Sequence, residues 1–323
     1  METTGQEDRL YTSVKPCFTL FEPCTPVNYM KFLELCTRNC YKSEEHIKIG
    51  SAEKLLKRVV NDFGHYSVVE HANCVLEIKD PWIVEDMFQE FALHNPLLRM
   101  SFRDDARETL LISGNVRMWK DFLERWPQPG HAKCAIGHGI DSCLTAQWPF
   151  FFSTPIDRPH KSIRLLDCNP VTNDDKLSRS EMLQHMTMTG RFVGSRAMSH
   201  QLVRHRLAAY SQESMRYCNY GKKGFQFIIP PSVYEADIVE EYIAAMMNAY
   251  TEYEAFLSDG LKPEDARFVM PTAIKTEVIA TYTLGGWQHI IEHRGHNPKA
   301  QWEIKQLCLE AEEELEQEIP DLF

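Results

Sequence analysis

Apolar residues recur at helical spacing in several stretches of the 323-residue chain. Over residues 51–63 they predict an amphipathic helix, with Ser51 as its N-cap and Gly64 just beyond its C-terminus, where glycine tolerates a left-handed backbone. The same reasoning predicts further helices around 82–95 and 115–125, over 192–206, over 235–257 (closed by Gly260), from Pro263 to Pro271, and from an Asn297-Pro298 cap to about Gln317.

Strand character is weaker and is concentrated in residues 72–78 and 183–190. The region 81–181 is harder to interpret, because it contains a loop-like run at 127–139 and a polar connector from Asn169 to Asp175. Mainly helical patterning with a few strands predicts the α+β fold class.

Composition adds limits on function. The chain is 43% hydrophobic and 25% charged, as expected of a globular enzyme, and its net charge of −11 argues against a surface that coats nucleic acid. No apolar run approaches the roughly 20 residues that span a bilayer, and the first ten residues are polar and acidic. We therefore expect a cytoplasmic protein without membrane or nucleic-acid partners, whose ten cysteines are reduced thiols.

The segment 201–217, QLVRHRLAAYSQESMRY, is the strongest candidate for chemistry. Three consecutive basic residues cannot share one helix face, because neighbours are about 100° apart. Arginine binds phosphate through its planar fork, and nearby serine and glutamine side chains add hydroxyl and amide ligands. A solvated basic helix end explains Arg204-His205-Arg206 equally well, but not the additional Ser211, Gln212, Ser214 and Arg216.

This spacing resembles the signature of the flavin-dependent thymidylate synthases, the ThyX family. It comprises Arg204-His205-Arg206, seven residues, Ser214, and then Arg216-Tyr217. Other blocks resemble family segments in the same order: Arg38 to Tyr41, Gly64 to His71, Glu264 to Pro271, the positions Thr281, Trp287, His289 and Arg294, and Ala300 to Ile304.

The resemblance implies reductive methylation of dUMP to dTMP, with methylenetetrahydrofolate as carbon donor, NADPH as reductant and bound FAD. It implies FAD contacts from Ser67, Arg204, His205, Arg206, Leu207, Gln212, Thr283 and His289. It implies dUMP contacts from Gln201, Leu202, Val203, Arg204, Gln212, Glu213, Ser214, Met215, Arg216, Arg267 and Arg294.

Arg294 matches the family residue that activates the uracil ring. A fixed cation beside the N3–O4 edge of uracil would stabilise negative charge as C5 becomes nucleophilic. Arg294 cannot act as a base, because a guanidinium stays protonated. We therefore assign the catalytic role to Arg294.

Several positions depart from the family pattern. Thr283 and Gly285 stand where the family commonly has Asn and Arg, so part of the flavin contact is lost or moved. This keeps open a second hypothesis, a catalytically weakened flavin- or nucleotide-binding relative that acts as a sensor or subunit. Ser211 and Gln212 also replace a frequent Asn-Glu pair, which removes one negative charge near the nucleotide.

Chain length is a further departure. Residues 81–181 are expected to be a mainly helical insertion within a single domain spanning 1–323, which otherwise has a ThyX-like central antiparallel sheet flanked by helices. The insertion is either a surface elaboration or a lid over the co-substrate entrance, from which Arg117 or Trp119 would reach the site. The resemblance also implies a homotetramer with active sites between subunits.

A metal site is not expected. His289, His293 and His296 have helical spacing, but Gly295 and Pro298 interrupt the helix and no Glu adjoins the first histidine. A histidine-metal hydrolase remains a third alternative, which predicts stoichiometric zinc.

Overall fold

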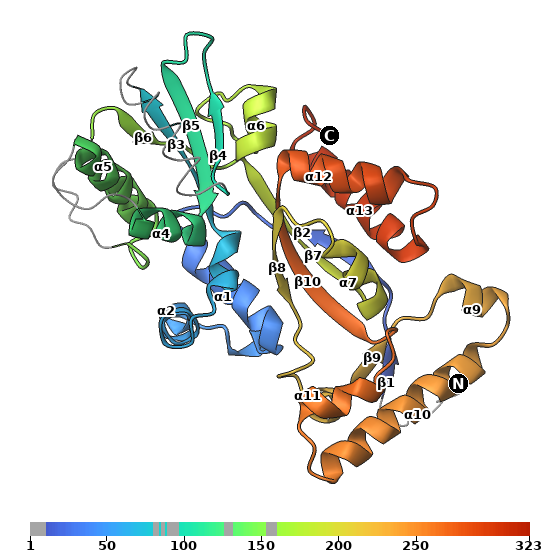
Figure 1. Ribbon diagram of the computed structural model, residues 1–323. Helices are drawn as coiled ribbons and strands as arrows, with labels where there is room; N and C mark the ends of the chain where they lie inside the picture. The colour runs from blue at the N-terminus through green and yellow to red at the C-terminus, as the bar shows by residue number, and fades with distance from the viewer. Residues whose placement is uncertain (1–10, 80–83, 85–87, 89–96, 126–131, 153–159) are drawn as a thin grey trace.

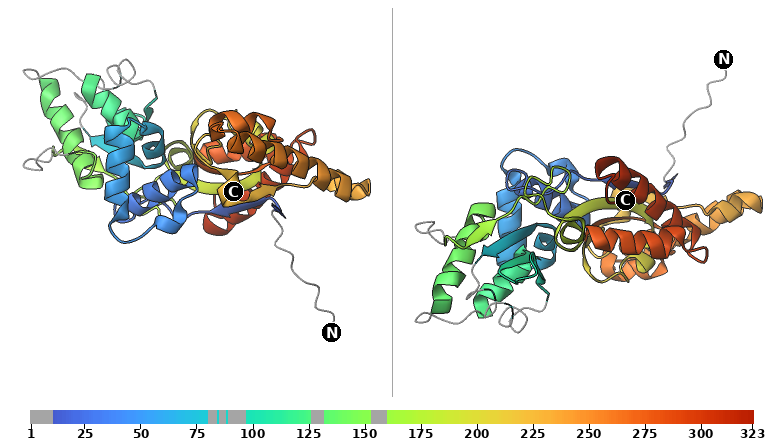
Figure 2. Two further views of the ribbon diagram at one scale, coloured as in Figure 1. Left: turned by 90° about the horizontal axis from the view of Figure 1, so that it is seen from below. Right: turned by 90° about the horizontal axis from the view of Figure 1, so that it is seen from above.

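The computed structural model describes residues 11–79, 84, 88, 97–125, 132–152 and 160–323. These residues form two lobes, one mostly of the N-terminal half and one mostly of the C-terminal half (Figure 2). Each lobe is built on a four-stranded antiparallel sheet. The α+β class is thus confirmed, with two such sheets among the described residues instead of the one expected.

The first sheet, in the C-terminal lobe, has the order β2-β7-β10-β8. Its strands are β2 (Cys17–Leu20), β7 (Thr187–Ser195), β10 (Lys275–Thr283) and β8 (Ala208–Gln212). One face packs against α1 (Tyr29–Tyr41) and the 3-10 segment Tyr66–His71, and the other against α7 (Arg196–Leu202), α12 (Leu284–Ile290) and α13 (Trp302–Glu318) (Figure 1). Residues 208–212 of the segment 201–217 form the edge strand β8 of this sheet.

A small parallel pair, β1 (Tyr11–Ser13) and β9 (Phe225–Phe227), extends this lobe. It packs on the long helix α10 (Val239–Ser258) through a separate core that includes Phe225, Phe227 and Tyr250. The short helices α8 (Tyr220–Lys223), α9 (Pro231–Glu235) and α11 (Pro263–Ala266) complete the lobe.

The second sheet has the order β4-β5-β3-β6. It consists of β3 (Asn73–Lys79), as predicted for 72–78, with β4 (Arg99–Phe102), β5 (Thr109–Asn115) and β6 (Ile163–Leu165). Cys74, Leu76 and Ile78 share a core with α4 (Val116–Arg125) and α5 (Ala132–Gln147), whereas Val75 joins the core around α12 and α13. The side-chain alternation of β3 therefore ties the two lobes together.

Region 81–181 accordingly supplies three of the four strands of this sheet. The prediction of a mainly helical region missed them, because two of the strands have only three and four residues, too few for a periodic signal. The helix predicted at 115–125 is confirmed as α4. The loop-like run at 127–139 is helical from Ala132 onward, and the helix predicted around 82–95 lies almost wholly outside the described residues.

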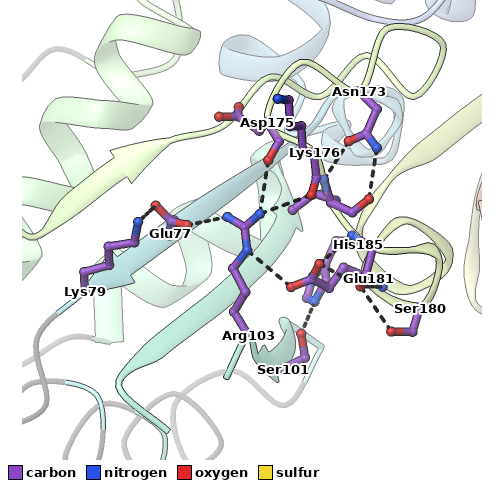
Figure 3. A network of polar contacts seen from close by, with 12 residues as sticks. Glu77, Lys79, Ser101, Arg103, Asn173, Asp175, Lys176, Ser180, Glu181 and His185 are labelled. Atoms are coloured by element: carbon purple, nitrogen blue, oxygen red, sulfur yellow. Dashed lines mark hydrogen bonds and ion pairs between the residues drawn. The ribbon is translucent and has the colours of Figure 1, made fainter. Parts of the chain in front are cut away.

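A polar network joins β3 to β4 and to the segment that follows β6 (Figure 3). Glu77 on β3 is 1% exposed and accepts hydrogen bonds from Arg103 at 2.5 Å and Arg164 at 3.1 Å. Burial alone would raise the pKa of Glu77, but the hydrogen bonds from Arg103 and Lys79 hold it below its usual value. Arg164 also bonds Asp175, and the Arg103 guanidinium lies 3.5 Å from Glu181 at the start of α6 (Arg179–His185). Each of these guanidinium groups is thus neutralised by carboxylates.

Helix α6 corrects the strand predicted over 183–190. Ser178 and Glu181 form a reciprocal capping box, which starts a helix that continues to His185. The strand begins only at Thr187 and extends to Ser195, so the helix predicted over 192–206 is limited to α7.

Other helix ends also shift. Over 51–63 the structure has α2 (Ser51–Leu56) followed by a π-helix (Lys57–Asp62), and Gly50, not Ser51, is the N-cap. Gly64 has the expected positive φ of 67°. Helix α10 starts at Val239 because Asp237, with φ 56°, interrupts the chain after α9.

The C-terminal helices keep their predicted identity but not all of their limits. A π-helix (Ile291–His296) prolongs α12, so α13 is capped by Gln301 and not by Asn297-Pro298. The predicted helix at Pro263 is confirmed as α11 followed by a 3-10 turn (Arg267–Val269).

Candidate active site

The Arg204-His205-Arg206 segment forms a loop between α7 and β8. Ser195 caps α7, and the helix ends at Leu202. The Tyr210 hydroxyl lies 2.5 Å from the His205 carbonyl oxygen and 2.7 Å from the Tyr282 hydroxyl, which fixes the loop over the sheet. Tyr210 was not among the predicted site residues. Its position four residues after Arg206 was the one signal in the sequence that it could hold this loop in place.

The two arginines of this loop are open to solvent. Arg204 and Arg206 are exposed, and neither forms an ion pair with any residue in the described part of the chain. The neighbouring Leu207 is 87% exposed, an unusual position for a large apolar side chain. The loop therefore offers cations and an apolar surface with no partner from the same described chain.

His205, His289 and Arg294 are brought into direct contact. The Arg294 Nε donates to His205 Nε2 at 3.1 Å, and the His205 and His289 rings lie 5.7 Å apart. Burial, together with the adjacent Arg294, lowers the pKa of His205 to about 4. Near pH 7 His205 is therefore a neutral acceptor, and the terminal guanidinium nitrogens of Arg294 remain available for a ligand.

A second group of predicted residues gathers around Glu264. Arg216 Nε donates to the Glu264 carboxylate at 2.7 Å, and Arg267 Nε donates to the Glu264 carbonyl oxygen at 3.0 Å. Arg196 donates to the Glu213 carbonyl oxygen at 3.3 Å. Burial lowers the pKa of Arg196, and the nearby Arg267 lowers it further. Position 196 was missed by the sequence analysis, where it was only one residue of a predicted helix.

Gln212, a position that departs from the family pattern, is held inside the lobe. Its side-chain amide donates to Ser199 Oγ at 2.8 Å and Thr276 Oγ1 at 3.2 Å. Because these bonds use the amide nitrogen, only the amide oxygen of Gln212 is left for a ligand, and its direction is fixed.

Thr283 and Gly285 have structural explanations. The Thr283 hydroxyl accepts a hydrogen bond from Gly286 N at 3.0 Å and so caps α12. A Cβ atom at Gly285 would lie 3.0 Å from the Leu183 carbonyl oxygen of α6. A larger residue would therefore require α6 to give way by a few tenths of an ångström at Leu183.

Several predicted substrate-binding residues have buried side chains: Leu202, Glu213 and Met215 are 0%, 2% and 9% exposed. Glu213 accepts a hydrogen bond from the Tyr220 hydroxyl at 3.0 Å. Any ligand contact from these three residues would have to come largely from their main chain. Gln201 and Ser214 are half-buried, and Val203 is exposed.

The early block packs directly on β8. Asn39 donates to the Ser211 carbonyl oxygen at 2.8 Å, and Ser214 N donates to the Cys40 carbonyl oxygen at 3.0 Å. His71 is 1% exposed and hydrogen-bonds Ser211 and Thr281 at 2.9 and 2.8 Å. Blocks distant in sequence thus meet at one strand.

Ser67 is exposed on the 3-10 segment, and no contact in the structure joins it to His205 or Arg294. Nearby, Arg117 reaches Glu70 at 2.6 Å, whereas Trp119 is fully buried. Of the two residues considered for a lid, only Arg117 therefore lies on the surface next to this segment.

The histidines near the C-terminus diverge. His289 and His293 rings lie 4.1 Å apart, but His296 bonds Glu312 at 2.9 Å. No group of three or more His, Cys, Asp or Glu residues in the described ranges could hold a metal ion. Within the same ranges, no helix has the length and apolar character needed to cross a membrane.

Comparison with known proteins finds a match for residues 176–321. These residues match the family described as thymidylate synthase complementing protein. The chain is 40% identical over 136 residues to the flavin-dependent thymidylate synthase of Geobacter sulfurreducens, covering 42% of this chain and 58% of the relative. It is 37% identical over 131 residues to that of Thermococcus onnurineus, covering 39% and 53%. The chain thus spans somewhat more than half the length of these relatives.

A solved structure shows weaker similarity. The UMP/dUMP methylase PolB from Streptomyces cacaoi, bound with 5-Br dUMP, aligns with a TM-score of 0.40 and 22% identity over 44% of this chain and 75% of that one. The sequence matches, and not this alignment, carry the similarity to this family.

Proposed function

We propose that the chain belongs to the family of flavin-dependent thymidylate synthases, with which it shares sequence similarity, and that it converts dUMP to dTMP by reductive methylation. Methylenetetrahydrofolate supplies the carbon and NADPH the reducing equivalents. The observation that carries the proposal is a set of arginines that have no ion-pair partner in the described part of the chain. These arginines lie within residues 176–321, the segment that matches the family model.

The dUMP phosphate is assigned to the group around Glu264. Arg267 and Arg216 provide guanidinium groups, and the Ser214 hydroxyl adds a donor to the same loop. Arg196 reinforces the local positive charge from beneath. Gln201 to Arg204 and Gln212 to Arg216 complete the proposed nucleotide contacts.

Arg294 is assigned to the uracil edge. Its Nε is fixed by the neutral His205, so its other nitrogens have a defined direction. A positioned cation stabilises charge that develops on the N3–O4 side of the ring without having to reorganise. Arg294 would therefore act electrostatically, while proton transfer falls to other groups.

The residues fit an anionic cofactor such as FAD. Arg204 and Arg206 are exposed without ion pairs among the described residues, as a diphosphate would require, and Leu207 adds apolar surface. We assign FAD to these residues with Ser67, His205, Gln212, Thr283 and His289. When bound, FAD supplies the redox and carbon-transfer chemistry, and the protein orients it.

The assembly we propose is a homotetramer with shared sites. Leu207 and Phe268, 87% and 84% exposed, flank the proposed flavin and nucleotide contacts. Large apolar side chains beside a binding loop are typical of surfaces that a second subunit covers. We further propose a cytoplasmic location and a ThyX-like single domain, with 81–181 as an insertion.

The test uses the purified chain. It should be yellow, and it should release tritium from C5-labelled dUMP only when NADPH and methylenetetrahydrofolate are both present. Flavin absorbance without tritium release would instead support the weakened relative with a sensor or subunit role, which Thr283 and Gly285 keep open. A colourless protein with stoichiometric zinc would contradict both.

A further inference from the structure

A cavity of about 550 Å³ lies beside the first turn of α2, next to the end of α1. We call it the basic cavity, because its lining includes Arg38, His46, Lys48, Lys54 and Arg58, against the single carboxylate Glu45. None of the residues assigned to dUMP or FAD lines it.

The wall of the basic cavity is built around a buried anion. Glu34, 1% exposed, accepts a hydrogen bond from Arg38 Nε at 2.7 Å and another from the Ser51 hydroxyl at 2.7 Å. The same Ser51 oxygen accepts from Lys48 N at 3.0 Å. Glu34 thus fixes both Arg38 and the turn that carries Lys48, so the cavity keeps its shape.

The remaining cations are not neutralised. Lys48, Lys54 and Arg58 form no ion pair with any residue in the described ranges; Arg58 lies over the Phe63 ring at 5.3 Å. Four permanent cations, counting Arg38, face two carboxylates, Glu45 and Glu34, which leaves a local charge near +2 on a chain whose net charge is −11. Such a concentration of positive charge favours an anion.

The cavity also has an apolar wall. Ile49 is fully exposed to solvent, and Leu55 lines the cavity beside it. Cations next to uncovered apolar side chains suit a ligand with both a ring or chain and anionic groups, rather than a bare inorganic ion.

A row of aromatic side chains connects the basic cavity to the proposed nucleotide site. The Phe63 ring, under Arg58, lies 6.1 Å from His65, whose Nδ1 is 3.4 Å from the Tyr41 hydroxyl. The Tyr41 ring is 5.3 Å from that of Tyr217, which lies under Arg216. A ligand reaching from one site to the other would follow this row.

We propose that the basic cavity binds the anionic end of an extended co-substrate. This rests on the proposed function and adds a subsite to it. Two sources share the chemistry: the additional phosphate of NADPH, and the carboxylates of a polyglutamylated methylenetetrahydrofolate.

The direct test measures binding of tripolyphosphate to the purified full-length chain by isothermal titration calorimetry, with saturating dUMP present to occupy the nucleotide site. The double variant Lys54→Gln, Arg58→Gln should weaken binding about tenfold or more, because two cations are lost from one small cavity. Lys57→Gln is the matched control, since Lys57 is exposed on the same helix segment but does not line the cavity. Thermal melting verifies that all variants are folded.

Equal affinity in the wild type and the double variant would overturn the proposal, and so would an equal loss in the Lys57→Gln control. This measurement does not need turnover, so it stands even if the enzyme is inactive and the proposed function fails.

Kinetics with the active enzyme distinguish the two sources. If the NADPH phosphate occupies the basic cavity, the double variant raises KM for NADPH but not for NADH. If folate carboxylates occupy it, KM rises for the pentaglutamate but not for the monoglutamate. Unchanged KM values for both NADPH and the pentaglutamate would overturn the assignment to a co-substrate.

Discussion

Two groups of arginines in this protein have opposite surroundings. Arg103, in the network of Figure 3, and Arg164 on β6 are held by Glu77, Asp175 and Glu181. Arg204, Arg206, Arg267 and Arg294 form no ion pair with any residue in the ranges that the structure describes.

The difference separates structure from binding. A guanidinium neutralised by buried carboxylates fixes one element to another, whereas one that is positioned but not neutralised keeps its charge for a ligand. The first group joins β3, β4 and the segment before α6; the second surrounds the proposed flavin and nucleotide sites. Arg216 is intermediate, since it pairs with Glu264 although it is assigned to the dUMP phosphate.

The largest expected effect comes from the second group. Arg294→Ala should lower turnover about a hundredfold or more, because it removes a positioned electrostatic donor. Tritium release from C5-labelled dUMP measures this, with dUMP affinity measured separately. Arg164→Ala, an arginine from the neutralised group, should change turnover less than about twofold. Near-normal turnover in Arg294→Ala with dUMP still bound would refute the role of Arg294.

Removing the central anion of the first group should affect stability instead. Glu77→Gln should lower the free energy of unfolding by about 2 kcal/mol, because the partly buried Arg103 loses its charged partner. Urea unfolding measures the change. Glu312→Gln, which breaks the exposed pair with His296, should cost less than about 0.5 kcal/mol. Similar losses in both variants would show that the Glu77 network contributes no more than a surface pair.

His185 makes this network sensitive to acid. Its imidazole is 1% exposed and bonds Ser101 at 2.7 Å and Ser113 at 2.8 Å, and burial lowers its pKa from 6.5 to about 3. The unfolded chain therefore takes up this proton first, so stability is complete above pH 6.5 and declines as pH falls toward 3.

His185→Gln should remove about 1 to 2 kcal/mol of the stability loss between pH 7.5 and 5.0. Urea unfolding at the two pH values measures it. Burial also lowers the pKa of His71 to about 3. His71 should therefore account for a similar loss of stability at low pH, and the His185→Gln variant should retain this loss. Parallel pH dependence in wild type and variant would show that His185 does not contribute.

The smallest expected effect is on dUMP binding and concerns Arg216, the arginine that pairs with Glu264. Glu264→Gln should strengthen dUMP binding about twofold, because it frees Arg216 from an exposed ion pair. Calorimetric titration with dUMP measures it, and the urea unfolding curve should stay unchanged because the pair is exposed. Weaker binding would instead mean that Glu264 holds Arg216 in its binding position.

Much of the local structure was predictable. The strand at 72–78, the helix at 115–125 and the helix opened by Pro263 follow from periodicity and from proline's fixed φ. The errors lay partly at boundaries and partly in region 81–181, where three strands were missed. The capping box at Ser178 produced a helix where a strand was predicted, and the π-helix after α12 delayed α13.

The candidate site, too, was predictable in part. The spacing from Arg204 to Ser214 and Arg216 already indicates a resemblance to one family, because those residues lie in the two loops that flank β8. Which arginines keep their charge could not be predicted, because a carboxylate partner can come from any distance along the chain, as Glu77 and Arg164 show.

By itself, then, the sequence determined the helix and strand periods and the order of chemically active side chains, which depend on near neighbours. Tertiary structure decided the pairing of β3 with strands of region 81–181, the contact of Leu183 with Gly285, and the bond from Arg294 to His205. The last two contacts join residues that are 89 or more positions apart in the sequence. No local pattern encodes that such residues come within bonding or packing distance of each other.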